Sequence, residues 1–501
     1  MVKGLAELCI KSGEEQPEVC TGILNNYVPI IVDVLIQSDF TPTELCGYFK
    51  ICSDYGSDNQ DIVKERQQSS FSNPHAVGST KKEYKDITTQ EPLVKNLKTN
   101  STIGYFLQLT DIHFDPDYKV GSNPNCGRPL CCRDGTGDAG VIGHYLCDIP
   151  LSTVQLIFNH LQTLTDQIDF IIWTGDNPPH NVWEQSQTQQ EFATQTLAQL
   201  ILKTFPNTPV FPVIGNHEAY PSDQYVLPNT QWLLDSLYTY WMPWLDTDAL
   251  ESVKEYGYYT TLLRPGLRVM CLNTLENDMI NFYNLLPTYL KGPNNQSDWM
   301  INTLEQAEGN GEKVLILGHI PCTVKSASTD QWCAMYEQVV SQFSDVIVGQ
   351  IYGHTHYDQF NVFSDVETHT KPTGMNYIAP SMTTYQNHEP GYRIYEFDYS
   401  TNQIINYYQY HANITDANKS GQITFDLIYS AKELYNLPDL TPASWYNLAT
   451  QMKTNTTLFM DYFTNLSSSP DKESCDQSCQ TKWVCQIFGI TSTEFDKCYG
   501  V

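Results

Sequence analysis

Five stretches of the sequence place a carboxylate, an amide or an imidazole directly after a short apolar run. The central one is the apolar run 168–173, which ends abruptly at Gly175-Asp176-Asn177-Pro178-Pro179-His180. Such a loop presents Asp176 at the carboxyl end of a buried strand, where open α/β sheets place their ligand sites. The other four stretches end at Asp111 and His113, at Asn216 and His217, at His319, and at His354 and His356.

These residue types indicate metal chemistry. Six of the chain's twelve histidines lie in the five stretches, and Asp, Asn and His are suitable ligands for zinc and similar metals. An isolated aspartate in a loop is more often a local cap, but five such strand ends argue for one shared site. Two divalent ions about 3.5–4 Å apart can clamp the attacking and leaving oxygens of a phosphoryl transfer. The sequence therefore predicts a two-metal site for that reaction.

The order of the motifs, D-x-H, G-D-N, G-N-H-E, G-H and G-H-x-H, resembles that of the metal-dependent, calcineurin-like phosphoesterases. The resemblance implies an α/β fold with a two-sheet layered core and two divalent metal ions, for which zinc is the expected identity. It also implies a ligand set for each ion, with Asp176 bridging the two. One ion takes Asp111, His113, Asp176 and His356, and the other takes Asp176, Asn216, His319 and His354.

The charge of the chain limits its partners. The net charge is −29, from 28 basic and 57 acidic residues. We expect no nucleic-acid partner, because a phosphate backbone requires basic patches. An acidic balance also suits a compartment of low pH, where carboxylates are partly protonated and self-repulsion falls. With 501 residues and a hydrophobic content of 41%, the chain can form more than one domain.

Fifteen cysteines, most of them in local clusters, indicate an oxidising compartment. Their irregular spacing and the lack of nearby paired histidines argue against zinc fingers. Cys271 lies in a strand-like apolar run and is expected to be a buried free thiol. The local bridges expected are Cys9–Cys20, Cys322–Cys333, Cys475–Cys479 and Cys485–Cys498, with two more among Cys126, Cys131, Cys132 and Cys147.

Other signals agree with the secretory pathway. Residues 1–9 lack the apolar region of a signal peptide, and no apolar run approaches the roughly 18–20 residues that cross a bilayer. Since a disulfide-rich chain needs export, we expect the natural N-terminus to lie upstream of Met1. Six N-x-S/T sequons mark possible glycosylation sites. They begin at Asn100, Asn295, Asn413, Asn418, Asn455 and Asn465.

The N-terminal part separates into two regions. Residues 1–53 carry apolar residues at helical spacing, with a capping box at Thr41–Glu44 that opens a second helix. The placement of their cysteines resembles the second half of a saposin domain, which implies contact with lipids. By the same resemblance the partners of Cys46 and Cys52 lie upstream, so both are expected to be free or joined to each other. Residues 54–100 are polar and predict a linker.

Residues 101–415 alternate strands with helices, as is typical of an α/β domain. Within it, the stretch 126–147 predicts a disulfide-stapled loop near the mouth of the site. Residues 416–501 predict a helical, disulfide-rich C-terminal domain. The expected helices are 152–166, 184–203, 298–308, 334–343, 425–435 and 441–452. The strand-like segments 257–263, 268–273, 377–379 and 392–398 indicate a second, more antiparallel sheet.

A wider resemblance covers nearly the whole chain. The runs 111–118, 129–133, 173–183, 379–385 and 390–395 are similar to the acid sphingomyelinase family. This resemblance implies a phosphodiesterase that hydrolyses sphingomyelin to ceramide and phosphocholine through a metal-bridging water. We expect a monomer that acts on sphingomyelin in membrane surfaces or lipid vesicles, at a lysosomal or secreted location.

His180 and His217 lie beside candidate ligands but complete neither metal shell. A histidine with a pKa near 6.5 can protonate the leaving alkoxide of ceramide in an acidic lumen. We assign one as the general acid and the other as a phosphate contact, and the sequence leaves open which is which. By resemblance, Tyr385 lines the substrate pocket. Two alternatives are a related phosphodiesterase acting on nucleotides or other phosphodiesters, and a lipid-binding saposin-type protein with an inactive site.

Overall fold

The computed structural model describes residues 15–38, 102–286, 295–324, 326–471 and 474–500, together with Lys3, Leu5, residues 9–11, Gly13 and Thr41. Four predictions concern residues outside this described part. They are the linker at 54–100, the second N-terminal helix after Thr41, the state of Cys46 and Cys52, and the sequon at Asn100.

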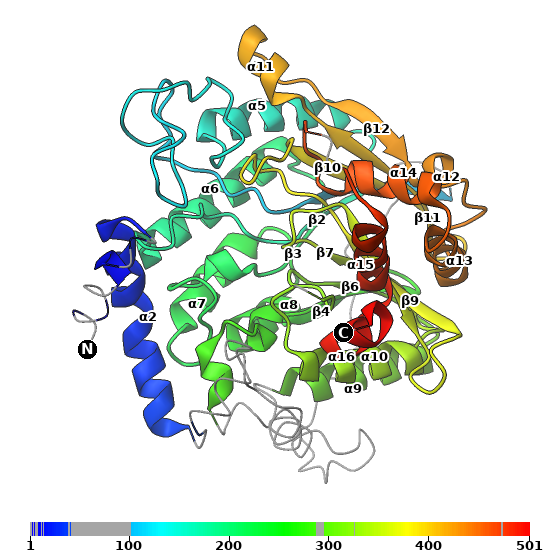
Figure 1. The fold of residues 1–501 in the computed structure, drawn as a ribbon. Coiled ribbons are helices and arrows are strands. Elements are labelled where there is room, and N and C mark those ends of the chain that lie inside the picture. The colour runs from blue at the N-terminus through cyan, green and yellow to red at the C-terminus, as the bar shows by residue number, and fades with distance from the viewer. Residues whose placement is uncertain are drawn as a thin grey trace.

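Two six-stranded mixed sheets form the centre of the molecule (Figure 1). The first has the order β12-β11-β10-β1-β2-β3 and the second the order β4-β5-β6-β7-β9-β8. Strands β1, β2 and β3 run parallel, as do β5, β6, β7 and β9. The strands are β1 (Ile103–Leu109), β2 (Phe170–Trp173), β3 (Val210–Pro212), β4 (Tyr259–Arg264), β5 (Leu267–Cys271), β6 (Lys313–Leu317), β7 (Ile347–Tyr352), β8 (Gln359–Ser364), β9 (Pro372–Ile378), β10 (Gly391–Asp398), β11 (Gln403–His411) and β12 (Asp426–Ser430).

One hydrophobic core joins the two sheets. It contains side chains from both, such as Leu109 and Ile171 of the first sheet and Leu317 and Ile351 of the second. All four residues of β2 are buried, as expected of a parallel strand that is covered on both faces. The continuous apolar runs of the sequence therefore correspond to strands that lie between layers. This confirms the predicted two-sheet α/β core.

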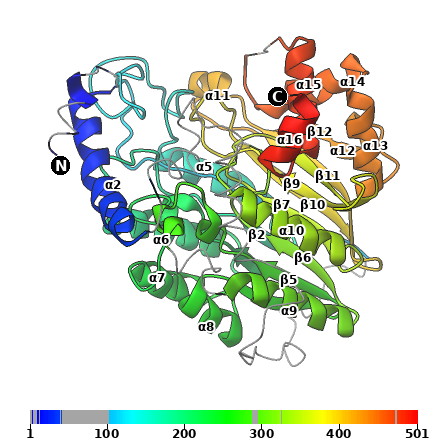
Figure 2. The same ribbon diagram turned by 60° about the horizontal axis from the view of Figure 1, so that its bottom comes forward.

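Helices cover the outer faces of the sheets (Figure 2). In both views α2 lies on the opposite side of the molecule from α13 and α14. The helices are α2 (Pro17–Gln37), α5 (Leu151–Leu161), α6 (Gln187–Thr204), α7 (Gln231–Trp241), α8 (Thr247–Tyr256), α9 (Gln296–Gly309), α10 (Asp330–Gln342), α11 (Ile414–Ser420), α12 (Ala431–Leu434), α13 (Pro442–Met452), α14 (Thr456–Leu466), α15 (Gln477–Phe488) and α16 (Ser492–Tyr499). Short 3-10 helices are η2 (Gln162–Leu164), η3 (Asn216–Glu218), η4 (Thr274–Asn277) and η5 (Phe282–Leu285).

Two sequence predictions about these elements are wrong. The segment 425–435 is not one helix, because β12 occupies Asp426–Ser430 and only the four residues of α12 are helical. Antiparallel pairing with β11 overrides the helical spacing of its apolar residues. The second sheet is present, but only three of the four strand-like segments lie in it, and it is not mainly antiparallel, because β5, β6, β7 and β9 run parallel. Strand β10 pairs with β1 in the first sheet, whereas β4, β5 and β9 belong to the second.

Helix α2 packs against the α/β domain. The Asn26 amide donates to the carbonyl of Val182 at 3.1 Å, and the Tyr27 hydroxyl donates to that of Ser222 at 3.2 Å. By length and composition α2 is also apolar enough to cross a membrane, a test that core helices of soluble proteins pass as well. The sequence of α2 does not form one long uninterrupted apolar run, because Glu18 and Asp33 lie within it.

The described residues contain six disulfides, and all six are among the predicted pairings. Cys126–Cys131 and Cys132–Cys147 resolve the alternatives that the sequence leaves open in the insert after β1. The others are Cys9–Cys20, Cys322–Cys333, Cys475–Cys479 and Cys485–Cys498. Cys271 is a buried free thiol, as predicted. Burial raises its pKa, so we expect it to be unreactive.

The sequons differ in the accessibility of their amide groups. The Asn418 amide donates to the carbonyl of Gly143 at 3.0 Å, and its oxygen accepts from the N–H of Ile142 at 2.8 Å. The side chains of Asn413 and Asn455 are exposed and only cap helices through their oxygens. We therefore expect glycans at Asn413 and Asn455 but not at Asn418. Glycopeptide mass spectrometry of the protein purified from a glycosylating host checks this, and a glycan at Asn418 would contradict it.

Candidate active site

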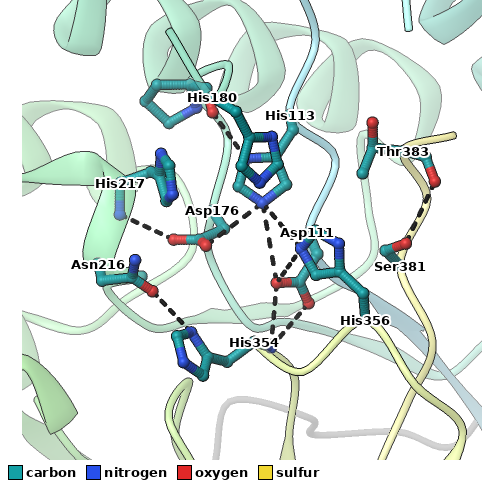
Figure 3. A network of polar contacts seen from close by, with 12 residues as sticks. Asp111, His113, Asp176, His180, Asn216, His217, His354, His356, Ser381 and Thr383 are labelled. Carbon is teal, nitrogen blue, oxygen red and sulfur yellow. Dashed lines mark hydrogen bonds and ion pairs between the residues drawn. The ribbon is translucent and has the colours of Figure 1, made fainter. Parts of the chain in front are cut away.

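The five motifs meet at one place between the sheets. Strands β1, β2 and β3 of the first sheet and β6 and β7 of the second point their carboxyl ends toward it. In Figure 3 the side chains that follow these strands converge on a common centre. Parallel strands from two facing sheets thus bring together residues that are up to 245 positions apart, from Asp111 to His356.

One group of candidate ligands combines the ends of β1 and β7. The ligand atoms of Asp111, His113 and His356 all lie within 4.8 Å of one another, and all three residues are buried. The Nε2 atoms of His113 and His356 are 3.2 Å apart, and Asp111 Oδ1 is 3.5 Å from His356 Nε2. The backbone N–H of His354 donates to both oxygens of Asp111 at 3.0 Å, which fixes this carboxylate between the two strand ends.

A second group combines the ends of β2, β3, β6 and β7. The ligand atoms of Asp176, His319 and His354 lie within 4.8 Å of one another. Asn216 joins them through its amide oxygen, which is 2.8 Å from both His319 Nε2 and His354 Nδ1. The Asn216 amide nitrogen donates to Asp223 at 2.9 Å and so directs the oxygen toward the histidines.

Asp176 lies between the two groups. Its Oδ2 is 3.3 Å from His113 Nε2 and 3.1 Å from His319 Nε2. Its Oδ1 accepts from the backbone N–H of His217 at 2.9 Å. One carboxylate therefore faces a histidine of each group, which is the geometry that a bridging ligand requires.

The backbone around these side chains is unusual. Five of the seven candidate ligands have a positive φ, a conformation that residues other than glycine rarely adopt. Such strain is maintained only where the surrounding structure enforces it, and it concentrates at functional sites. The values are 49° for Asp111, 40° for His113, 60° for Asp176, 71° for His354 and 62° for His356.

The hydrogen bonds of the Nδ1 atoms of His113 and His319 indicate whether this site can bind cations. A carbonyl oxygen can only accept, so the ring nitrogen facing it carries the proton. His113 Nδ1 is 2.7 Å from the carbonyl of Pro178, and His319 Nδ1 is 2.6 Å from that of Thr174. In the neutral ring, Nε2 then presents a lone pair to Asp176. Facing lone pairs repel each other unless a positive charge lies between them.

The pKa values of His113 and His319 also indicate that the site binds cations. Burial alone would lower the pKa of both histidines, but the Asp176 carboxylate outweighs it and raises the pKa of His113 to about 9 and that of His319 to about 10. The carboxylates therefore require positive charge at the Nε2 positions, which bound cations supply. The donor set of carboxylate, amide oxygen and imidazole fits a pair of divalent metal ions.

Glu218 supports the loop that carries Asp176. Its carboxylate accepts from the backbone N–H groups of Asp176 at 3.0 Å, Asn177 at 2.7 Å and Gly215 at 2.6 Å. Burial and then the Asp176 charge raise the pKa of Glu218 to about 7. Glu218 belongs to the G-N-H-E motif, but the sequence alone indicates no role for it. Because it holds a ligand's backbone from behind, it has the place of an outer-shell positioning residue.

His180 has a carboxylate partner, Asp148, that the sequence does not indicate. Its Nδ1 is 2.9 Å from Asp148 Oδ1, and its backbone N–H donates to Asp148 Oδ2 at 2.8 Å. The Thr383 hydroxyl donates to the same carboxylate at 2.9 Å. Asp148 directly follows Cys147 in the disulfide-stapled insert, where nothing in the local sequence indicates a role. Only the fold brings it behind His180.

His217 has different surroundings. Its ring centroid lies 4.8 Å from that of His113 and 4.9 Å from that of His180. Its Nδ1 is buried and has no hydrogen-bond partner among the described residues. The structure thus separates two histidines that the sequence cannot distinguish. One has a carboxylate behind its ring, and the other does not.

Tyr385 lies at the same edge of the site. Its ring centroid is 4.3 Å from that of His180, and its hydroxyl donates to the carbonyl of Pro129 at 3.0 Å. Pro129 belongs to the stapled insert, so the insert borders the site, as its position in the sequence suggests. Tyr385 can therefore contact a substrate that reaches His180.

Asp148→Asn should lower turnover by about 10–100-fold, the usual cost of losing a partner that orients a functional side chain. Burial lowers the pKa of His180 and Asp148 opposes this effect. In the variant the Asp148 charge no longer opposes burial, so His180 loses its proton at lower pH. We expect the upper pH limit of activity to shift downward by about one unit. A pH–rate profile measures this shift, and an unchanged profile would argue against the role of Asp148. The matched control is Asp138→Asn, which changes an exposed carboxylate of the same insert.

Comparisons with known proteins agree with this geometry. Residues 104–358 match the family model of calcineurin-like phosphoesterases, and residues 371–500 match the acid sphingomyelin phosphodiesterase C-terminal region. Sphingomyelin phosphodiesterase A of Dictyostelium discoideum is 78% identical and covers 100% of this chain and 87% of its own length. The sphingomyelin phosphodiesterase of Homo sapiens is 33% identical over 94% of this chain and 74% of that protein.

A relative with another printed activity is also similar. The cyclic GMP-AMP phosphodiesterase of Mus musculus is 31% identical over 79% of this chain and 92% of that protein. All these relatives are phosphodiesterases by name, and the chain matches a phosphoesterase family model over half its length. The chain belongs to the acid sphingomyelin phosphodiesterases, which are calcineurin-like phosphoesterases with a two-metal site.

Proposed function

We propose that this protein hydrolyses sphingomyelin to ceramide and phosphocholine at the site between the two sheets. The observation that carries the reaction type is the position of Asp176, whose Oδ2 faces a histidine of each ligand group. The choice of sphingomyelin rests on relatives of that activity that align along the whole chain. We further propose a monomer that acts on membrane surfaces in lysosomes or outside the cell.

The proposed ligands are those carried over from the family resemblance, with zinc as the metal. When bound, such a metal pair activates water for attack on phosphorus and stabilises charge on the phosphoryl oxygens. His319 and His354 would hold one ion together with Asn216, and Asp111, His113 and His356 would hold the other, with Asp176 between them. All seven side chains lie in the site, so the described residues offer no support for an inactive lipid-binding protein.

We assign His180 as the general acid. The attacking water forms a bond to phosphorus as the bond from phosphorus to the ceramide oxygen breaks, and that oxygen must gain a proton. Asp148 accepts a hydrogen bond from His180 Nδ1, so Nε2 of the protonated ring is free to donate toward the leaving oxygen. The side chain of His180 is 16% exposed. It is more open than His217, which suits contact with substrate.

His217 is then the phosphate contact. It lacks a carboxylate partner for its ring, and its backbone N–H is bound to Asp176. A ring held this way can donate to a phosphoryl oxygen, where charge develops in the transition state. Tyr385 lies over His180 and would line the pocket for the group that leaves or for the choline head group.

The test measures two substrates with the purified chain. Phosphocholine release from sphingomyelin vesicles is compared with hydrolysis of cyclic GMP-AMP, each with and without a metal chelator. We expect sphingomyelin turnover that the chelator abolishes and that added zinc restores. Turnover of the nucleotide alone would favour the alternative phosphodiesterase. Absence of hydrolysis with both substrates in the presence of zinc would overturn the proposal.

A further inference from the structure

A second cluster of ligand-type side chains lies far from the active site. Glu337 of α10, His369 of the β8–β9 connection and Glu494 of α16 each offer one ligand atom, and these atoms all lie within 4.8 Å of one another. The three residues come from three elements that are separate in sequence. Helices α10 and α16 lie side by side in Figures 1 and 2. The family resemblance assigns no function to this cluster.

The buried carboxylate of Glu337 needs a positive partner. Glu337 is only 5% exposed, and the group that reaches its carboxylate is another carboxylate, that of Glu494. Within the part of the chain that the structure describes, no backbone or side-chain nitrogen donates to Glu337. Two carboxylates in contact cannot both be ionised unless a proton or a cation lies between them. Burial and then the charge of Glu494 accordingly raise the pKa of Glu337 to about 8.

Glu494 is held in place by its other oxygen. Its Oε2 accepts from the backbone N–H groups of Ile490 at 3.0 Å and Thr491 at 2.8 Å, and from the Thr491 hydroxyl at 3.1 Å. These bonds form the capping box of α16. Oε1 is left to face His369. An outer set of bonds that orients a carboxylate in this way is typical of metal ligands.

His369 supplies the nitrogen ligand. Its Nδ1 is 3.8 Å from Glu494 Oε1, too far for a hydrogen bond but suited to a shared ion. Among the described residues it is the one basic side chain paired with either carboxylate. The nearby carboxylate of Asp365 is already occupied, because it accepts from the backbone N–H groups of Thr368, Thr370 and Lys371.

We propose that Glu337, His369 and Glu494 form a third divalent-cation site, of the zinc type, that fastens helix α16 to helix α10 and to the β8–β9 connection. One imidazole and two carboxylates are suitable zinc ligands, and water completes a tetrahedral shell. The ion replaces the shared proton between the carboxylates. It adds a link at the N-terminus of α16, where Ser492 already bonds to Asp330, while Cys498 near the other end of the helix is joined to Cys485.

Metal counting tests the proposal. The full-length chain is stripped with chelator, reloaded with zinc at pH 7.5, separated from free metal and analysed by mass spectrometry for zinc per chain. We expect about three ions in the parent protein and about two in His369→Ala. The control Glu367→Ala changes an exposed carboxylate of the same connection and should keep about three. Since His369 is 46% exposed, its removal should leave the fold intact.

Two further variants separate this site from the catalytic pair. Glu337→Gln keeps the volume of the side chain and can donate to Glu494, so it should fold and bind about two ions. Asp176→Ala should lose the catalytic ions and keep about one. Hydrolysis of a nitrophenyl phosphodiester should stay within about twofold in His369→Ala, because the cluster does not contact substrate. Equal zinc content in the parent, His369→Ala and Glu337→Gln would overturn the proposal. It would mean that a shared proton, and not a metal ion, lies between the carboxylates of Glu337 and Glu494.

Discussion

Asp176→Ala should abolish binding of the catalytic metal pair and lower turnover by at least about 10³-fold. The reason is that, among the described residues, Asp176 Oδ2 is the one carboxylate oxygen that pairs with a ring nitrogen of each ligand group, 3.3 Å from His113 and 3.1 Å from His319. Alanine removes the bridging ligand and leaves each group with three side chains. The fold should persist, because the shared hydrophobic core and the disulfides do not depend on this carboxylate.

Zinc content and initial rates measure this prediction, and circular dichroism checks the fold. Asp166→Ala, an exposed carboxylate four residues before the start of β2, is the matched control and should behave as the parent. Asp176→Ala protein that still held both catalytic ions and kept its rate within tenfold would refute the bridging assignment. Loss of metal without loss of rate would refute the two-metal mechanism itself.

The sequence indicates the candidate ligands because each lies a few residues beyond an apolar strand. Asp176 is three residues and His319 two residues beyond the end of its strand, so local pattern alone places them at a sheet edge. It does not reveal that the strands belong to two different sheets. That arrangement depends on the pairing of β10 with β1 and of β9 with β7. Long-range pairing of this kind has no local signature in one sequence.

The supporting residues are harder to predict for the same reason. Asp148 is 32 positions before His180, in a loop whose path is set by the Cys132–Cys147 disulfide. Glu218 contacts the Asp176 loop only because β2 and β3 are neighbours. The error at 425–435 is similar, since β12 is an edge strand with Leu427 and Ile428 exposed and resembles an amphipathic helix locally. In each case a tertiary contact decides the structure or the role.

The roles of the two site histidines can be separated by the leaving group. His180→Ala should lower sphingomyelin turnover by about 10²–10⁴-fold, the usual value of a positioned proton transfer. With a nitrophenyl ester most of that loss should disappear, because nitrophenolate leaves without a proton. His217→Ala removes a phosphate contact, so its loss should be similar for good and poor leaving groups.

Rates of the two variants on both substrates, at matched zinc content, measure the difference. The geometry predicts the asymmetry, since Asp148 lies 2.9 Å from His180 Nδ1 whereas His217 Nδ1 has no partner among the described residues. His160→Ala is a control, because this histidine lies at the end of α5 and bonds to Tyr392 rather than to the site. If His217→Ala were the variant rescued by nitrophenolate, the assignments would be exchanged. If neither variant were rescued, the proton would come from a group other than these histidines, and Asp148 would orient His180 for binding alone.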